Sequence, residues 1–318
     1  MYRIATDACD IQIWGRHFGD DTPRVKYFNE AQDLLYYAED CKLTVQRGGV
    51  ECYTVPGTGS NLKVQIQTAG SESEIREDTP TLSYMPPVIK TVTLDVDQKP
   101  LSTAEGGVLL VWGKNFGRAD KHGKLICGNW QIPYRFTGEC VVPSEDLSKL
   151  RHNLPEEISR QLEVMKCFMR DGVGALSEFQ LEIQGVKSPP FHSNEVIQFA
   201  APVIQRVHKV SEKTSDIDLE FSRRGGEPFL IEGTNLGPKG TSIRVQYSTS
   251  TGVTHTAVDC QVVTPHRSVQ CYSTPGSGKA WEFWLSVEST PTLKRTSTNL
   301  GYEGESMDAE VDGNGDFQ

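Results

Sequence analysis

Cysteine is the residue type whose number and spacing point most clearly to chemistry in this chain of 318 residues, which contains eight of them. Six recur as pairs: Cys41 and Cys52, Cys140 and Cys167, and Cys260 and Cys271. Ten residues separate the members of the first and third pairs, and an insertion lengthens the second. Recurrence at one spacing is typical of a disulfide framework, so we predict one bridge within each pair. The alternative is that these cysteines are small buried hydrophobic residues.

The remaining two cysteines, Cys9 and Cys127, have no counterparts elsewhere in the chain. They are either free, joined to each other, or joined to a neighbouring chain. The six paired cysteines indicate an oxidising compartment, because disulfides persist outside the cytoplasm. We therefore expect the chain to be extracellular or at the cell surface.

A metal site is suggested only near the end of the chain, where Asp312, Asn314 and Asp316 place oxygen donors on alternate residues. This spacing resembles the start of a calcium-binding loop. Phe317 stands where such a loop needs glycine, and the sequence from residue 303 onward contains six acids and no bases. A solvated acidic tail is the alternative. We expect no cofactor, with Ca²⁺ as the only candidate.

The sequence contains no recognisable set of catalytic residues. No two of the seven histidines have the i, i+4 spacing of a helical zinc pair. The segment from Ser273 to Ala280 looks like a phosphate-binding loop, but it lacks the first glycine and has Ala280 where Mg²⁺ needs a hydroxyl. We predict that the protein is not an enzyme.

The elements that would position these residues recur three times along the chain. Each copy has an apolar strand ending in a G-x-x-[FL]-G turn, whose glycines are Gly15 and Gly19, Gly113 and Gly117, and Gly233 and Gly237. Glycine permits a positive φ where the chain bends sharply out of a strand. The Phe or Leu between the glycines is expected to enter the core. We predict that these six glycines form structural turns.

A second landmark, C-[FY]-x-x-[PD]-G-x-G, begins at Cys52, Cys167 and Cys271. Twelve residues after each of these cysteines, an alternating apolar pair begins: Val64 and Ile66, Phe179 and Leu181, and Phe283 and Leu285. Alternation with period two predicts a half-buried β-strand. The same offset in three places shows that the repeat is real.

The joints between copies also repeat, as P-V-I-x-x-V at Pro87 and at Pro202. No Gly/Ser-rich linker intervenes, so successive copies should be stacked with restricted angles, as a semi-rigid rod. We predict three domains, 1–86, 87–201 and 202–288, followed by an acidic tail, 289–318. We refer to the first three ranges as repeats one, two and three.

These motifs resemble the IPT/TIG family of immunoglobulin-like β-sandwiches over about residues 10 to 290. All three motifs are present in repeat three, whereas repeat two has Asp171 in place of the signature proline and repeat one lacks a recognisable opening strand. The resemblance implies an all-β fold of tandem immunoglobulin-like domains. It further implies extracellular adhesion or receptor modules or, less often, a module beside a DNA-binding domain in a nuclear transcription factor.

Short helices are expected in addition to the strands of this fold. In the insertion of repeat two, Asn153 and Pro155 mark a helix start, and Ile158, Leu162 and Met165 share one helical face. That face is expected to cover its own sandwich, with a partner-binding helix as the alternative. Residues 29–40 are predicted to form a shorter helical turn.

Composition narrows the possible partners. With 32 basic and 42 acidic residues the net charge is −10, which disfavours nucleic acid and the nuclear reading. No stretch is apolar enough to span a membrane.

We expect a structural or adhesive function, with proteins as partners, either copies of the chain or other cell-surface proteins. A ligand-binding receptor ectodomain is the main alternative. Ser/Thr-Pro stretches such as 79–81 and 289–292 permit O-linked glycans.

The two ends of the chain suggest a mode of assembly. Only ten residues precede Ile11, so the first strand of repeat one is expected to be short or missing, which leaves an edge that invites a strand from another chain. Thr290, Pro291, Thr292 and Leu293 echo residues 79–82, which lead into the opening strand of repeat two. Docking of this tail on the next molecule would produce a head-to-tail filament. A floppy tail is the alternative.

Overall fold

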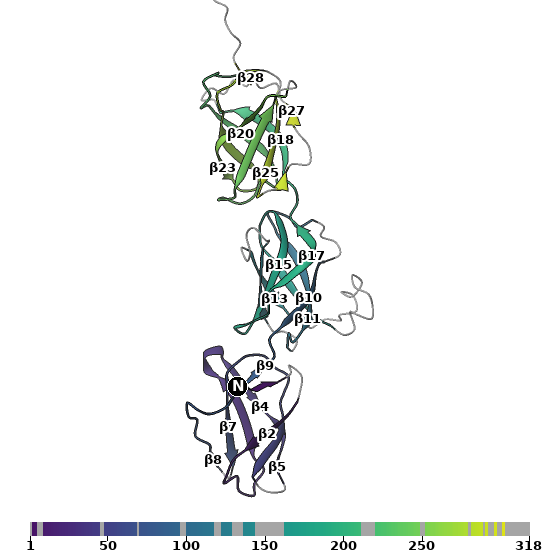
Figure 1. The fold of residues 1–318 in the computed structure, drawn as a ribbon, viewed down its shortest axis with the longest axis vertical. Coiled ribbons are helices and arrows are strands. Elements are labelled where there is room, and N and C mark those ends of the chain that lie inside the picture. The colour runs from purple at the N-terminus through teal and green to yellow at the C-terminus, as the bar shows by residue number, and fades with distance from the viewer. Residues whose placement is uncertain are drawn as a thin grey trace, which may run out of the picture. The chain divides into compact units, whose positions relative to one another are not determined.

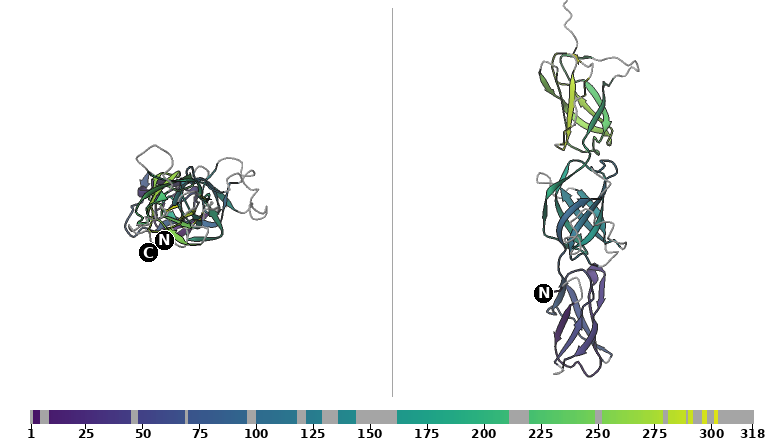
Figure 2. Two further views of the ribbon diagram at one scale, coloured as in Figure 1. Left: turned by 90° about the horizontal axis from the view of Figure 1, so that it is seen from above. Right: turned by 90° about the vertical axis from the view of Figure 1, so that its right-hand side faces the viewer.

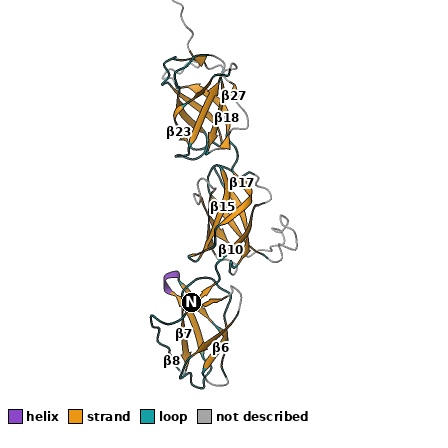
Figure 3. Ribbon diagram, in the orientation of Figure 1, coloured by secondary structure: helices purple, strands orange, loops and turns teal. Residues whose placement is uncertain are grey.

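The structure is a computed structural model of the chain. It describes residues 2–4, 9–44, 48–68, 70–95, 100–117, 122–128, 136–143, 162–210, 220–248, 252–278, 281–288, 290–291, 296–297 and 301–302. The described elements are almost all strands (Figures 1 and 3). Two compact units are formed: Met1–Leu101 with Gly106–Arg170 and Ala175–Gln198, and Ser102–Glu105 with Asp171–Gly174 and Phe199–Gln318. The division into three domains stays a prediction, because two short segments of repeat two belong to the second unit.

Repeat three shows the topology most fully. Its strands are β18 (Val203–Lys209), β19 (Glu220–Phe221), β20 (Pro228–Thr234), β21 (Ile243–Ser248), β22 (Thr254–Thr256), β23 (Val258–Thr264), β24 (Ser268–Tyr272), β25 (Glu282–Val287), β26 (Thr290–Pro291), β27 (Thr296–Ser297) and β28 (Gly301–Tyr302). One sheet has the order β18-β20-β24-β23 and the other β22-β21-β25-β26, while β19 pairs with β28. These are the A-B-E-D and C′-C-F-G orders of an immunoglobulin sandwich.

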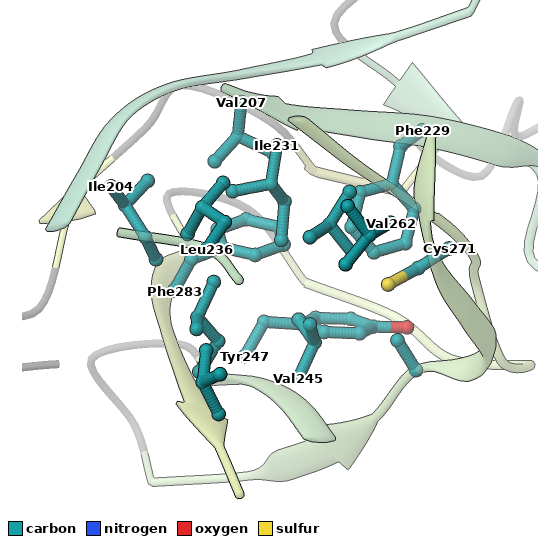
Figure 4. Packing of buried hydrophobic residues seen from close by; sticks show 14 of the residues in the cluster. Ile204, Val207, Phe229, Ile231, Leu236, Val245, Tyr247, Val262, Cys271 and Phe283 are labelled. Atoms are coloured by element: carbon teal, nitrogen blue, oxygen red, sulfur yellow. The ribbon is translucent and has the colours of Figure 1, made fainter. Parts of the chain in front are cut away.

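The core of repeat three lies between these two sheets. Phe229 and Ile231 project from β20, and Tyr247 and Phe283 from the facing sheet; all four are fully buried (Figure 4). The ring centroids of Tyr247 and Phe283 are 5.2 Å apart and stacked. Alternate residues of each strand supply the core, as the period-two pattern predicts.

Repeat two uses the same strands in one continuous sheet. They are β10 (Val88–Leu94), β11 (Gly107–Lys114), β12 (His122–Gly128), β13 (Phe136–Val141), β14 (Glu163–Met169), β15 (Ala175–Ile183), β16 (Val186–Lys187) and β17 (Phe191–Gln198). The order is β10-β11-β14-β13-β12-β15-β16, and β17 also pairs with β15. Pairing of β12 with β13 joins the halves that stay separate in repeat three.

Repeat one is a sandwich of two sheets, one of which has three strands in the described part of the chain. Its elements are β1 (Tyr2–Ile4), β2 (Asp10–Trp14), β3 (Arg24–Asn29), the 3₁₀ helix η1 (Glu30–Gln32), β4 (Leu34–Tyr37), β5 (Glu39–Leu43), β6 (Gly49–Tyr53), β7 (Leu62–Thr68), β8 (Ser71–Glu72) and β9 (Thr81–Tyr84). One sheet is β1-β9-β7-β3-β4, with β8 paired to β7, and the other is β2-β6-β5. In the right-hand view of Figure 2 the strands of each repeat can be seen around their own interior.

A β-bulge explains the V-I-x-x-V pattern of the opening strands. The register of β10 against β11 shifts between Ile89 and Thr91, and that of β18 against β20 shifts between Ile204 and Arg206. A bulge inserts one extra residue, so apolar side chains three positions apart reach the same core. Ile204 and Val207 are accordingly both buried, 7% and 8% exposed.

The helix expectations need correction. Met165 lies in β14, paired with Val111 of β11, so it cannot belong to a helical stripe; Leu162 lies just before β14, and residues 144–161 lie outside the described part of the chain. Within residues 29–40 only Glu30–Gln32 is helical, and Leu34–Tyr37 pairs with β3 as a strand. In the described ranges, no helix has the length and apolarity needed to span a membrane.

Candidate functional site

Each repeat contains one disulfide, between the cysteines paired above. The bonds are Cys41–Cys52, Cys140–Cys167 and Cys260–Cys271, with Cα–Cα distances of 4.1, 4.0 and 4.1 Å. Each joins two neighbouring antiparallel strands of one sheet: β5 to β6, β13 to β14 and β23 to β24. The second cysteine of each pair is buried. The same cross-link therefore fastens the same place in all three repeats.

Cys127 is free and buried, and its surroundings explain why it has no counterpart in the sequence. It pairs with Phe179 across β12 and β15, as Tyr27 pairs with Val64 and Tyr247 pairs with Phe283. Cys127 thus fills the core position that a tyrosine occupies in the other repeats. Burial raises the pKa of its thiol to about 12, which makes it an unreactive thiol.

The tyrosines at this position hold the C-[FY]-x-x-P-G-x-G turn. The hydroxyl of Tyr27 accepts a hydrogen bond from the backbone N–H of Val55 at 2.9 Å, and that of Tyr247 accepts one from Thr274 at 3.0 Å. Tyr84 adds a bond from its hydroxyl to the Val55 carbonyl at 2.6 Å. Burial raises the pKa of both Tyr27 and Tyr84. The signature is therefore a structural turn.

The three final glycines of the strand-turn motif have left-handed backbones, with φ of +71° at Gly19, +85° at Gly117 and +84° at Gly237. The expectation of positive φ is wrong for the first glycines, Gly15, Gly113 and Gly233, which are not among the positive-φ residues. A Cβ on Gly113 would strike the carbonyl oxygen of Val88, and one on Gly233 that of Val203. Glycine is needed there because the opening strand approaches closely.

Residues that the sequence reading missed fix the start of each opening strand. The Nδ2 groups of Asn115 and Asn235 donate hydrogen bonds of 3.0 Å to the carbonyl oxygens of Pro86 and Ala201, the residues just before the V-I-x-x-V segment's proline. Both asparagines have positive φ, 65° and 61°. The motif has Asn or His at this position in all three copies, and this recurrence was the signal in the sequence.

In repeat one, none of the described strands takes the place that β10 and β18 hold beside β11 and β20. β2 corresponds to β11 and β20 but pairs only with β6 among the described strands. The short strand β1 lies elsewhere, parallel to β9. His17, at the position of the asparagines, also has positive φ (65°) and is exposed, with no hydrogen-bond partner in the described residues. The atoms nearest to a Cβ placed on Gly15 belong to the ring of Phe18.

An apolar groove of about 730 Å³ runs beside this open edge. β2 contributes Ile11 and Ile13 to it, and residues of β1, β7 and β9 line it from the opposite sheet: Ile4, Val64, Ile66 and Leu82. Asp10, Arg16 and Glu74 supply polar groups at the same groove. Trp14, the last residue of β2, is 67% exposed. Of the apolar residues at the groove, Ile4, Ile11, Ile66 and Leu82 are buried, and Ile13 and Val64 are half-buried.

The remaining candidate residues do not form a site in the described chain. No group of three His, Cys, Asp or Glu residues capable of holding a metal occurs there. Asp312, Asn314 and Asp316 lie outside the described residues, as do Thr292 and Leu293. Cys9 is free and partly buried, with its sulfur 3.3 Å from the Thr54 hydroxyl.

The docking role expected of the tail stays a prediction, and the first residues of the tail pair within their own repeat. Thr290 pairs with Val287 and Pro291 with Ser286, so β26 extends the sheet of its own repeat. Gly301–Tyr302 likewise pairs with β19 of the same repeat. These backbone groups are used internally, because they supply the last strand of the sandwich.

Comparisons with known proteins give the following result. No family model and no curated protein matches the chain. Among solved structures it is similar to the plexin A4 extracellular region (TM-score 0.26, 11% identity, 95% of this chain and 28% of that one) and to FdeC, an Escherichia coli adhesin (0.26, 9%, 94% and 93%). A third is invasin, a bacterial integrin-binding protein (0.22, 9%, 92% and 56%). The chain spans 28% of the plexin region, and scores this low carry no argument about function.

Proposed function

We propose that this chain is a non-enzymatic extracellular or cell-surface protein with a structural or adhesive role, built from IPT/TIG-like modules. The observation that carries the proposal is the disulfide between equivalent neighbouring strands in all three repeats. Three such bonds in one chain are stable in an oxidising compartment and rare in the cytosol. Its partners are then other proteins, and its joints are semi-rigid.

The restricted joint has support within the second compact unit. Val173, from the turn of repeat two, is buried in the core cluster of repeat three. The hydroxyl of Thr103 donates to Oδ1 of Asn235 at 3.1 Å. Thr290 and Pro291 pair with β25 on one side, so head-to-tail assembly would have to use the other edge of β26 or a different contact.

A ligand-binding receptor ectodomain is the second candidate, favoured by the groove beside β2. Because the groove lies on one repeat's sheet edge, it suits binding of a specific ligand better than a purely structural role.

The proposal is tested by antibody labelling of intact and permeabilised cells that express the protein. Labelling of intact cells is expected, with a cytosolic protein as the control that becomes labelled only after permeabilisation. Labelling of this chain that also requires permeabilisation, with no secreted protein in the medium, would contradict the proposal.

A further inference from the structure

We propose that the Cys260–Cys271 disulfide is a redox-sensitive site, which a dithiol reductant opens before it opens the disulfides of repeats one and two. This inference goes beyond the proposed function, in which the three bonds serve only as cross-links. It rests on three features of repeat three: the exposure of Cys260, the groove beside it and the positive charge of Lys239.

The exposure of the bonded cysteines differs among the three repeats. The second cysteine of each pair is buried, and Figure 4 shows the sulfur of Cys271 inside the core of repeat three. The first cysteines differ, because Cys41 is 9% exposed and Cys140 is 2% exposed, whereas Cys260 is half-buried. The rate of thiol–disulfide exchange depends on access to the sulfur that is attacked. Cys260 is therefore the bonded cysteine most open to attack.

A groove of about 650 Å³ lies beside Cys260. One wall is formed by residues 259–263 of β23, and the other by Lys239, Gly240 and Thr241 of the loop after β20. Among the described strands β23 pairs only with β24, so the groove lies at an edge of its sheet. A reductant can therefore approach Cys260 from this edge without displacing a described strand.

The charge at the groove favours an incoming thiolate. Lys239 is exposed and lines the groove together with Asp259. Asp259 has a counterpart in Asp40 of repeat one, and φ is 50° at both, so this acid does not distinguish the two repeats. The loop after β2 carries Asp20 and Asp21 and contains no lysine before β3 begins. Because the attacking species is an anion, the positive charge of Lys239 favours repeat three.

The exchange proceeds in two balanced steps. One thiolate of the reductant attacks the sulfur of Cys260 and forms a mixed disulfide, while the bond to Cys271 breaks and its electron pair leaves on the Cys271 sulfur, which takes up a proton. The second thiolate of the reductant attacks the reductant's own sulfur in the mixed disulfide. This step releases Cys260, which is then protonated, and leaves the reductant as a disulfide. Two electrons have passed from the reductant to the protein.

The leaving sulfur does not decide which bond opens first. It belongs in each repeat to the second cysteine of the pair, and Cys52, Cys167 and Cys271 are all buried. A buried thiolate leaves less readily than an exposed one, and this cost is common to the three bonds. The order of opening is therefore set by the first cysteine and its surroundings.

Reduction would release β23 at the edge of its sheet. The register of β23 against β24 is irregular between Val258 and Gln261 and again between Val262 and Thr264. Such irregularities interrupt the ladder of hydrogen bonds, and the cross-link at Cys260 lies within the first of them. We expect the backbone amides of β23 to exchange with deuterium faster in the reduced protein, with little change in β20.

The test follows the order in which the three bonds open. The oxidised full chain is treated with limiting dithiothreitol, the reaction is stopped with iodoacetamide in denaturant, and mass spectrometry measures the alkylation of each cysteine with time. We expect Cys260 and Cys271 to become alkylated at least about tenfold faster than the other four bonded cysteines. Opening of Cys41–Cys52 or Cys140–Cys167 at the same rate, or faster, would overturn the proposal.

Variants test the part played by the groove. Lys239→Glu should slow the opening of Cys260–Cys271 about threefold, and Lys239→Arg should keep the rate, because it keeps the charge. Arg244→Glu is the matched control, since it makes the same change in net charge at an exposed position of β21 in the facing sheet. Added salt should reduce the difference between the two glutamate variants. Equal slowing by both would overturn the assignment of the effect to this groove.

Mass spectrometry of the untreated protein separates this proposal from the proposed function. Disulfides that are absent before any reductant is added would contradict the proposed function, because the three bonds carry it. Three intact disulfides that open at equal rates would overturn only the redox-sensitive site, and the cell-labelling result would stand.

Discussion

The Nδ2 group of Asn235 donates a hydrogen bond of 3.0 Å to the carbonyl oxygen of Ala201, and this bond ties the turn after β20 to the start of β18. Asparagine suits the position twice over, because it tolerates the left-handed backbone, with φ of 61°, and because it supplies the donor. The turn and the opening strand are therefore held together by one side chain.

Replacement of Asn235 should weaken repeat three. Asn235→Ala loses two hydrogen bonds, to the Ala201 carbonyl and from the Thr103 hydroxyl, and adds strain at positive φ, so we expect the free energy of unfolding to fall by about 2–4 kcal/mol. Asn235→Gly loses only the two bonds and should cost about 1–2 kcal/mol. Urea unfolding measures both. Equal costs for the two substitutions would show that the hydrogen bonds, and not the backbone conformation, account for the whole effect.

The opening strand β10 also makes glycine necessary at position 113. Gly113→Ala would push a methyl group into both the Val88 carbonyl and the ring of Phe116, whereas the nearest atoms to the methyl group of Gly15→Ala are those of the Phe18 ring. We expect Gly113→Ala to cost about 1–3 kcal/mol more than Gly15→Ala. The comparison isolates the effect of the strand because the ring contact is common to both. Similar costs in thermal unfolding would mean that the ring alone requires glycine.

Much of this fold follows from sequence periodicity, and what does not follow has physical causes. The spacing of Cys260 and Cys271 indicated their pairing because it recurs at Cys41 and Cys52. Met165 was assigned to a helix because its spacing from Leu162 also fits one. Met165 instead pairs with Val111 in a sheet, and pairing between residues so far apart in the sequence leaves no local signal.

The candidate site was harder to read than the fold. The groove beside β2 depends on side chains from both sheets, which no local pattern in the sequence brings together. Likewise, the role of Cys127 emerges only when its register opposite Phe179 shows that it replaces a tyrosine. The sequence shows the order of residues within a strand, but it does not show which residues pair across neighbouring strands.

The Cys260–Cys271 bond should contribute to stability as a unit. Cys271→Ala removes a cross-link that closes a short loop, which we expect to cost about 2–4 kcal/mol, and Cys260→Ala should cost the same. The double variant should be no less stable than either single variant, as measured by denaturant unfolding without reductant. Additive losses would show that the two sulfurs act separately.

Acid should weaken repeat three through His255. Its ring stacks on Tyr247, with centroids 5.5 Å apart, and burial lowers the pKa of His255 from its ordinary 6.5. The unfolded chain then binds the proton more readily, so the free energy of unfolding falls as the pH drops below about 6.5. His255→Gln should reduce the loss measured between pH 7 and pH 5. A loss of the same size in that variant would contradict this role.

The number of free thiols tests the central claim, that each repeat carries its own disulfide in an oxidising compartment. The protein is isolated from the cells that produce it, with thiols blocked at lysis, and is titrated in denaturant without reductant. Two free thiols per chain, mapped by mass spectrometry to Cys9 and Cys127, are the predicted result. Six or eight free thiols would contradict the account, because the repeats would then be reduced where the protein works.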